Sequence, residues 1–235
     1  MTYNVYPEKI PGFILNVLQA FPTTLTIMVA SLVISLALGL LIAVMQLSGK
    51  RWAQAVARGW ISFMRGVPAL VMIFLLYFAF PQLLLATTGI NIANATKMNF
   101  VIAALSLIAS ANMGEMMRSA YLTVPKTQME ACLACGMTPR QAVRRIILPQ
   151  AVAVAVPLLG NNMIMLFKET SLAFSINVLD LMGRANVVSA ANYGANRLEL
   201  YVAVAIIYWV VCVAIMLVFG GLERVTTRGR RRAAA

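Results

Sequence analysis

Five long apolar stretches constrain this chain more than any other feature. They cover roughly residues 23–46, 69–86, 98–119, 150–176 and 200–220. Each has about the length that an α-helix needs to cross the hydrocarbon core of a bilayer. Because 61% of the residues are hydrophobic and only 11% are charged, no separate soluble domain fits beside these spans. The sequence therefore predicts an all-α membrane protein with five transmembrane helices, forming a single domain over 1–235.

The distribution of basic residues predicts the orientation of the chain. Of these residues, 12 follow the first, third and fifth spans and only 4 lie on the opposite side. This bias places the N-terminus outside and the C-terminus in the cytosol. We expect 1–22 to be an outer, interfacial segment, and no cleavable leader precedes the first span. The basic tail 221–235 fixes the topology and can touch anionic lipid. No basic stripe interleaved with aromatic residues suggests nucleic-acid binding.

A polar segment, 123–149, separates the third and fourth spans on the cytosolic side. Its first helix can begin at Thr127, with Glu130 three residues later, as in a capping box. Gly136 then supplies the left-handed turn that ends this helix. The segment is therefore expected to be shaped rather than flexible.

A second short helix is expected directly after this turn. Thr138 is the expected cap, Pro139 occupies the first helical position, and Gln141 completes another capping box. Pro149 is expected to stop the helix. Two capped helices in a cytosolic loop of a membrane protein suggest a docking site for another protein.

Charged side chains inside the third span are candidates for function. Glu115 and Arg118 lie three residues apart and share one helical face, which Asn112 extends toward the middle of the membrane. They can pair with each other near the cytosolic end. The pair is therefore either structural or part of a pathway.

The fourth span carries a second set of polar residues. Lys168 and Glu169 are neighbours, so their side chains point about 100° apart and each needs its own partner. An ammonium and a carboxylate held apart suit a zwitterionic substrate. Alternatives are a structural network across a subunit interface and a Lys168 side chain that reaches the outer surface. The candidate substrate pathway comprises Asn161, Asn162, Met165, Lys168, Glu169, Thr170 and Ser171.

The sequence shows no set of residues that would catalyse a reaction. It contains no histidine, no nucleophile elbow and no phosphate-binding loop, so any ATP that drives the protein is bound by another chain. Cys132 and Cys135 have metal-site spacing but no second pair, and we expect them to fill small-residue positions where a helix approaches a partner. No metal site is expected.

Helix packing is suggested by a row of small residues in the first span. Ser31, Ser35 and Gly39 recur every four residues, a pattern suited to close helix contact. No internal repeat is visible, and five spans cannot form two mirrored halves, which argues against a self-sufficient secondary transporter.

Several motifs resemble those of a known family. The polar segment reads Glu130-Ala131-x-x-Ala134-x-Gly136 and later Ile147-Leu148-Pro149, which is similar to the EAA coupling loop of bacterial ABC importer permeases. The polar-amino-acid branch is further suggested by three runs: Arg65-Gly66-Val67-Pro68-Ala69-Leu70, Val124-Pro125-x-x-Gln128-x-Glu130 and Leu166-Phe167-Lys168-Glu169-Thr170-Ser171-Leu172. The resemblance covers about residues 23–220.

This resemblance implies a type I importer permease in the bacterial plasma membrane that moves a polar amino acid. It implies a second permease subunit, identical or a sister chain, two ATPase subunits that bind ATP and Mg, and an extracytoplasmic binding protein. The implied coupling residues are Thr127, Glu130, Ala131, Ala134, Gly136, Met137, Pro139, Leu148 and Pro149.

The sequence departs from the family pattern at a few positions. Cys132 and Cys135 stand where alanine or leucine is commoner, and Val67 stands where threonine is commoner. Glu169 replaces the commoner aspartate, and its extra methylene changes the size of any pocket that it lines.

Two other functions account for part of the sequence. An ion-coupled secondary transporter or channel would use Glu115, Lys168 and Glu169 as a relay, but it gives the capped segment no role. A purely structural membrane subunit would explain the segment as a docking site, but it leaves the charges of the fourth span unexplained.

Overall fold

The computed structural model describes residues 6–233, with side-chain surroundings for 6–226. The regular secondary structure within that range is all helical, with loops between the helices. After a short turn at Pro7–Lys9, the helices are α1 (Ile10–Leu18), α2 (Phe21–Leu47), α3 (Arg51–Gly66), α4 (Ala69–Phe74), α5 (Phe80–Thr88), α6 (Lys97–Leu122), α7 (Lys126–Ala134), α8 (Pro139–Ala142), α9 (Leu148–Glu169), α10 (Leu181–Ala191) and α11 (Arg197–Ala233). Most side chains of the expected basic tail lie outside the described residues.

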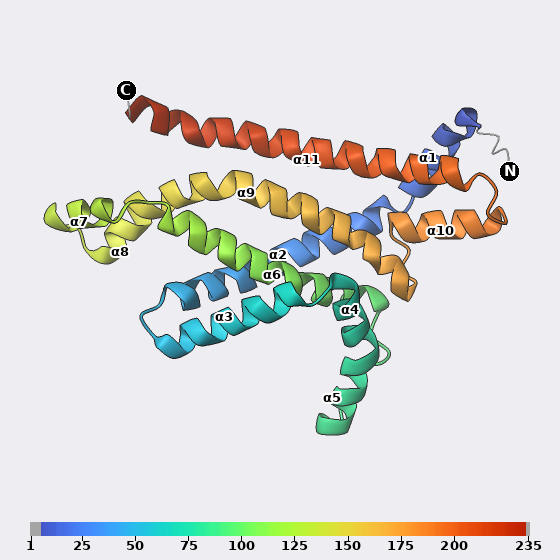
Figure 1. Ribbon diagram of the computed structural model, residues 1–235, viewed down its shortest axis with the longest axis horizontal. Helices are drawn as coiled ribbons and strands as arrows, with labels where there is room; N and C mark the ends of the chain where they lie inside the picture. The colour runs from blue at the N-terminus through green and yellow to red at the C-terminus, as the bar shows by residue number, and fades with distance from the viewer. Residues whose placement is uncertain (1–5, 234–235) are drawn as a thin grey trace.

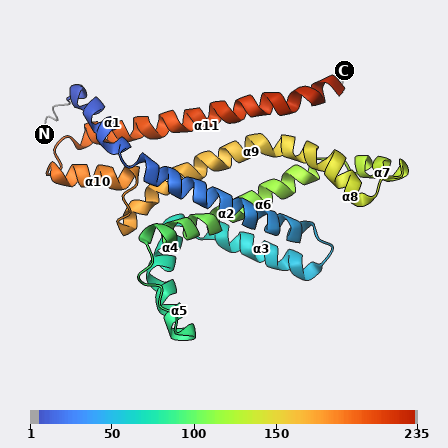
Figure 2. The ribbon, with the colours of Figure 1, turned by 180° about the vertical axis from the view of Figure 1, so that it is seen from behind.

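Five helical segments in the described range are long and apolar enough to cross a membrane, which confirms the predicted fold class. They are Phe21–Leu47, Ala69–Thr88, Lys97–Leu122, Pro139–Ile176 and Arg197–Thr226. In Figure 1, α2, α6, α9 and α11 run along the long axis, whereas α4 and α5 turn away from it. Figure 2 gives the same arrangement from behind, with α7 and α8 at one tip.

The closest helix crossing joins α2 to α6. Ser31 and Ser35 are fully buried there, as the small-residue pattern predicts, and the Ser31 hydroxyl donates to the carbonyl oxygen of Ile102 at 3.3 Å. A Cβ atom added to Gly39 would lie 2.6 Å from the Cβ of Met113 and 2.9 Å from the backbone nitrogen of Gly114. The two backbones therefore approach as closely as glycine allows.

Two π-helical turns lie inside the membrane-spanning helices. One covers Leu75–Ala79 and the other Val143–Ile147, and each is followed by one residue and then a proline, Pro81 or Pro149. A proline inside a helix lacks its N–H and its ring collides with the carbonyl four residues back. The wider i→i+5 turn removes this conflict. The prediction that Pro149 stops the second coupling helix is therefore wrong, because the helix continues into α9.

Helix α3 was not predicted from the apolar stretches. Its buried residues, Ala53, Ala57 and Met64, form one face. The exposed remainder carries arginines as well as large apolar side chains, among them Trp52 and Phe63. The indole Nε1 of Trp60 donates to the hydroxyl of Ser110 on α6 at 3.1 Å. This helix is amphipathic rather than uniformly apolar, so a search for long apolar runs passes over it.

Helix α10 lies in the loop between the last two spans and was also missed. The fully buried Asp180 caps it by accepting hydrogen bonds from the backbone N–H groups of Gly183 at 2.8 Å and Met182 at 3.2 Å. Burial raises the pKa of Asp180 to about 6, and the two backbone donors oppose that rise. The hydroxyl of Thr24 accepts from the N–H of Leu181 at 3.0 Å, which attaches α10 to α2.

The N-terminal helix α1 is docked onto the end of the protein that holds α10. It packs against α10 and α11, and its Val17 is fully buried. The guanidinium of Arg184 on α10 donates to Asn16 at 3.1 Å and to Gln19 at 2.8 Å. The part of segment 1–22 that the structure describes is thus integrated with the last two helices.

The α2–α6 crossing gives a direct test. We expect Gly39→Ala to lower the free energy of unfolding by about 1–3 kcal/mol, because the new methyl group forces the two helices apart. The matched control is Gly59→Ala in α3, where an added Cβ meets no atom within 4 Å. Denaturant unfolding in detergent micelles measures both. Equal stability of the two variants would contradict a tight crossing at Gly39.

Candidate functional site

The first coupling helix begins one residue earlier than predicted. Helix α7 starts at Lys126 with Pro125 as its N-cap, and no side chain caps it. The predicted capping box of Thr127 and Glu130 is therefore wrong. Pro125 already has the extended backbone that precedes a helix, with φ −59° and ψ 139°, so the helix restarts directly after it.

The turn after α7 has the predicted left-handed glycine. Gly136 has φ +79°, and its N–H donates to the carbonyl of Leu133 at 3.0 Å. The N–H of Met137 donates to the carbonyl of Cys132, also at 3.0 Å. Together these bonds form a Schellman motif, which satisfies the carbonyls at the end of α7. An added Cβ at Gly136 would meet nothing within 4 Å, so only the backbone conformation requires glycine.

The second helix has the capping box that the sequence predicted. The N–H of Gln141 donates to the Thr138 hydroxyl at 3.3 Å, and the Gln141 side chain accepts from the N–H of Thr138 at 2.9 Å. Pro139 occupies the first turn of α8. From this cap the helix continues through the π turn into α9, so α8 and the fourth span form one helical rod.

A small apolar cluster holds residues 123–149, here named the coupling segment, to the membrane helices. Val124, Ile147 and Ala151 are buried in it, and Met129 of α7 packs against them. The side-chain amide of Gln150 also donates to the side-chain oxygen of Gln128 at 2.6 Å, which links α9 to α7. The sequence alone does not reveal this cluster, because it joins residues on the two sides of the Gly136 turn.

The surface of the coupling segment is open. Met137 is half-buried and Cys132 is buried. The remaining predicted coupling residues are exposed: Thr127, Glu130, Ala131, Ala134, Gly136, Pro139, Leu148 and Pro149. This surface combines small apolar groups with the carboxylate of Glu130 and the exposed basic side chains of Lys126, Arg140, Arg144 and Arg145.

A polar pocket of about 10 Å³, room for about one water molecule, lies between α6 and α9. Asn112 of α6 and Asn162 and Glu169 of α9 line it, together with Met165. The side-chain amide of Asn162 contacts the sulfur of Met116 at 3.4 Å. Positions 162, 165 and 169 recur at helical spacing, so α9 turns one polar face toward α6.

The remaining residues of the predicted pathway lie elsewhere. Lys168 and Asn161 are exposed and do not line the pocket. The Thr170 hydroxyl donates to the carbonyl of Phe167 at 2.7 Å, and the Ser171 hydroxyl donates to the carbonyl of Lys168 at 2.7 Å. The structure thus brings Asn162, Met165 and Glu169 together and separates them from the ammonium group.

The charged residues of the third span pair with each other. The guanidinium of Arg118 lies 2.6 Å from a carboxylate oxygen of Glu115. Both side chains are about one-third exposed, at 32% and 34%. This geometry agrees with the structural interpretation of the pair and gives Glu115 a permanent cationic neighbour.

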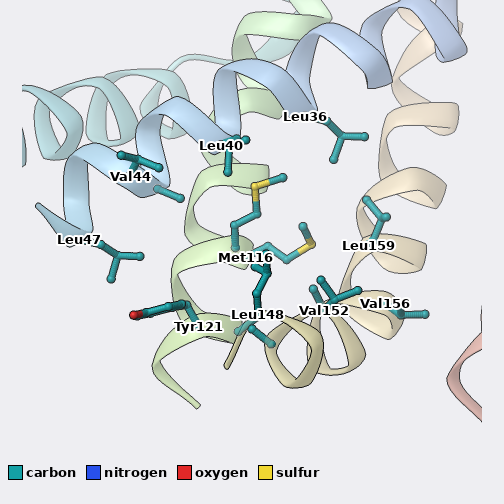
Figure 3. Close-up of a pocket in the computed structure, with 15 residues that line it drawn as sticks. Leu36, Leu40, Val44, Leu47, Met116, Tyr121, Leu148, Val152, Val156 and Leu159 are labelled. Carbon is teal, nitrogen blue, oxygen red and sulfur yellow. The ribbon is translucent and has the colours of Figure 1, made fainter. Parts of the chain in front are cut away.

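An apolar cavity of about 420 Å³ lies among α2, α6 and α9. Figure 3 shows leucine, valine and methionine side chains pointing into it, with the hydroxyl of Tyr121 at one side. Charged and amide side chains are absent from its lining. The cavity can accept hydrocarbon chains, but its apolar lining offers almost no hydrogen bonds to a polar solute.

Comparison with known proteins identifies the family. Residues 35–228 match the family described as binding-protein-dependent transport system inner membrane component. The chain is 37% identical to the probable amino-acid permease protein YxeN of Bacillus subtilis, covering 92% of this chain and 93% of that one. It is 38% identical to the probable amino-acid ABC transporter permease protein PatM of Vibrio harveyi, covering 83% and 85%.

A solved structure agrees with these relatives. A chain from the crystal structure of an amino acid ABC transporter with histidines superposes with a TM-score of 0.81 at 28% identity, covering 95% of this chain and 99% of that one. Five apolar helices in the described residues fit a multi-pass inner-membrane protein. The chain belongs to the family of binding-protein-dependent transport system inner membrane components, the non-catalytic permease subunits of ABC importers.

Proposed function

We propose that this chain forms the membrane pathway for a polar amino acid in an ATP-driven bacterial importer. The observation that carries the proposal is the similarity, over more than four-fifths of the chain, to permeases named for amino-acid transport. The ion-coupled alternative is not favoured, because family membership assigns the energy source to a separate ATPase subunit. A purely structural role would leave the polar pocket without a use.

The polar side chains between α6 and α9 support a polar cargo. Because the pocket itself holds only about 10 Å³, we propose that the two helices move apart to admit that cargo. Its two asparagine side chains offer both donors and acceptors, and Glu169 offers a carboxylate to an ammonium group. Lys168 lies outside this pocket, so we propose that the cargo's amine meets Glu169 while its carboxylate is held by amide groups. This arrangement replaces the Lys168–Glu169 pair as the zwitterion-binding hypothesis.

The continuous rod from α8 into α9 supports the proposed coupling. We propose that segment 127–148 rests in a groove on an ATPase subunit that binds ATP and Mg, and moves as a rigid body with it. Because α8 runs through the π turn into α9, a shift of the segment tilts the helix that carries Asn162 and Glu169. Alternating access requires a link of this kind between energy source and pathway.

The assembly that we propose contains further partners. A second permease subunit, identical or a sister chain, completes the pathway, and an extracytoplasmic solute-binding protein delivers the cargo. The basic residues place the N-terminus outside and the C-terminus in the cytosol, near anionic lipid.

ATP hydrolysis tests the proposed function. The chain is reconstituted in vesicles with its co-purifying partners and assayed with a binding protein that is empty or loaded with candidate amino acids. We expect the loaded binding protein to stimulate hydrolysis and thereby to identify the cargo. If no ATPase co-purifies and uptake follows an ion gradient, the relay of Glu115, Lys168 and Glu169 becomes the better explanation.

The turn after α7 predicts a coupling defect. We expect Gly136→Asp to abolish uptake while membrane insertion and assembly persist, because a carboxylate at this exposed turn prevents close approach to the ATPase. Gly136→Asn is the matched control, since asparagine tolerates the same left-handed backbone without adding charge. Uptake and ATPase stimulation in the same vesicles measure both variants. Normal uptake by Gly136→Asp would contradict the proposed coupling through this turn.

The polar pocket predicts an asymmetry between two adjacent residues. We expect Glu169→Gln to lower uptake by about tenfold or more, because a charged hydrogen-bond partner of the cargo is lost. Lys168→Gln, one residue earlier, is expected to have a much smaller effect because its side chain lies outside the pocket. Initial rates of labelled amino-acid uptake compare the two. Equal defects would restore both residues as zwitterion contacts.

A further inference from the structure

A second polar site lies apart from the pocket between α6 and α9. Two adjoining cavities, of about 430 and 390 Å³, open among the later half of α2, helix α3 and the later half of α6. They share Gln46, Arg58 and Glu115 as lining residues, so we treat them as one site, the arginine cavity. Each volume lies within the usual range of about 300–1,000 Å³ for small-molecule sites. Figure 2 shows α3 beside α2 and α6 at this place.

The charge of the arginine cavity is unbalanced. Arg58, Arg65 and Arg118 line it, whereas Glu115 is the single acidic residue in its lining. Glu115 is already paired with Arg118 at 2.6 Å. Arg58 donates through Nε to the backbone oxygen of Gln54 at 3.3 Å, which leaves the other guanidinium nitrogens for a ligand. The Nε of Arg118 is buried and has no hydrogen-bond partner within the described residues.

One face of α6 connects this cavity to the pocket described above. Asn112 lines the pocket and Glu115, one helical turn later, lines the arginine cavity. A rise of about 4.5 Å separates the two positions along the helix. Glu115 is therefore the next amide or charged side chain along α6 after Asn112, and Arg118 follows one turn later. The apolar cavity of Figure 3 lies elsewhere and offers no such contacts.

We propose that the arginine cavity is a cytosolic binding site for a zwitterionic α-amino acid, which occupies it on leaving the pathway. Arg58 and Arg65 bind its carboxylate, Glu115 accepts from its ammonium group, and the hydroxyl of Ser62 is a further contact. Only the groups common to all α-amino acids are recognised. Occupation from the cytosolic side then delays release of the next molecule, so the imported product slows its own uptake. This inference rests on the proposed function.

Uptake into vesicles with a varied internal solute tests this proposal. The whole transporter is reconstituted with ATP inside and loaded binding protein outside, and initial uptake of a tritiated amino-acid mixture is measured. We expect millimolar L-alanine inside the vesicles to slow uptake, whereas L-alaninamide, which lacks the carboxylate, does not. In Arg58→Gln/Arg65→Gln the internal L-alanine concentration for half-inhibition rises by about tenfold or more, relative to that variant's own uptake.

Controls separate this inference from the proposed function. Arg51→Gln, on an exposed position of α3 outside the cavity lining, should keep the wild-type sensitivity to L-alanine. If the double variant fails to assemble, Arg65→Gln alone serves, because Arg65 makes no hydrogen bond within the described part of the chain that its loss would break.

Each contrary result has a distinct meaning. Uptake that ignores internal L-alanine overturns the site and leaves the proposed function intact. Equal inhibition by L-alaninamide overturns carboxylate recognition, and with it the proposal. An arginine effect that depends on phosphatidylglycerol in the vesicles, and not on L-alanine, assigns the arginines to lipid and also overturns it. If no amino acid enters wild-type vesicles at all, the proposed function itself fails.

Discussion

Backbone N–H and C=O groups inside a bilayer have no water to pair with, and this constraint governs the whole chain. It explains why the membrane-spanning segments among the described residues are helical. It also explains the treatment of Pro81 and Pro149, which interrupt the usual hydrogen-bond ladder in spanning helices. The π turns before them let the helices continue. The helix runs without a break from α8 to the pocket residues of α9 because of the second π turn.

Packing among the helices depends on residue size rather than on hydrophobicity alone. Lipid is as apolar as leucine, so close contact must come from shape and from polar groups. The α2–α6 crossing uses both, with Gly39 against Gly114 and a serine hydroxyl donating across the interface. Larger side chains separate α2 from α9, and an apolar cavity remains between them. The α6 side chains Asn112, Glu115 and Arg118 thus line two polar places apart from this apolar cavity, the pocket and the arginine cavity.

Much of this architecture can be read from the sequence, and the failures have physical causes. Hydropathy gave the five spans because length and apolar content are sufficient to define them. The Thr138 box and the Gly136 turn were predictable because each depends on a few adjacent residues. The prediction of a capping box at Thr127 was wrong because α7 begins earlier, directly after Pro125. Helices α3 and α10 were missed because they are amphipathic or capped from within a polar loop. The separation of Lys168 from the pocket required the three-dimensional packing of α9 on α6.

The π turn at Val143–Ile147 has a consequence for angular register. A π turn holds one more residue than the α-helical turn that it replaces, so it acts as a one-residue insertion within the helix. Each residue of an α-helix advances the direction of the side chains by about 100°. The face that α8 presents is therefore offset from the face that α9 turns toward α6. Deleting one residue from this turn would keep all the other side chains of α8 and α9. It would nevertheless rotate α8 relative to α9 by about 100° about the axis of the rod. The orientation of the coupling segment relative to the pocket is thus encoded in a count of residues.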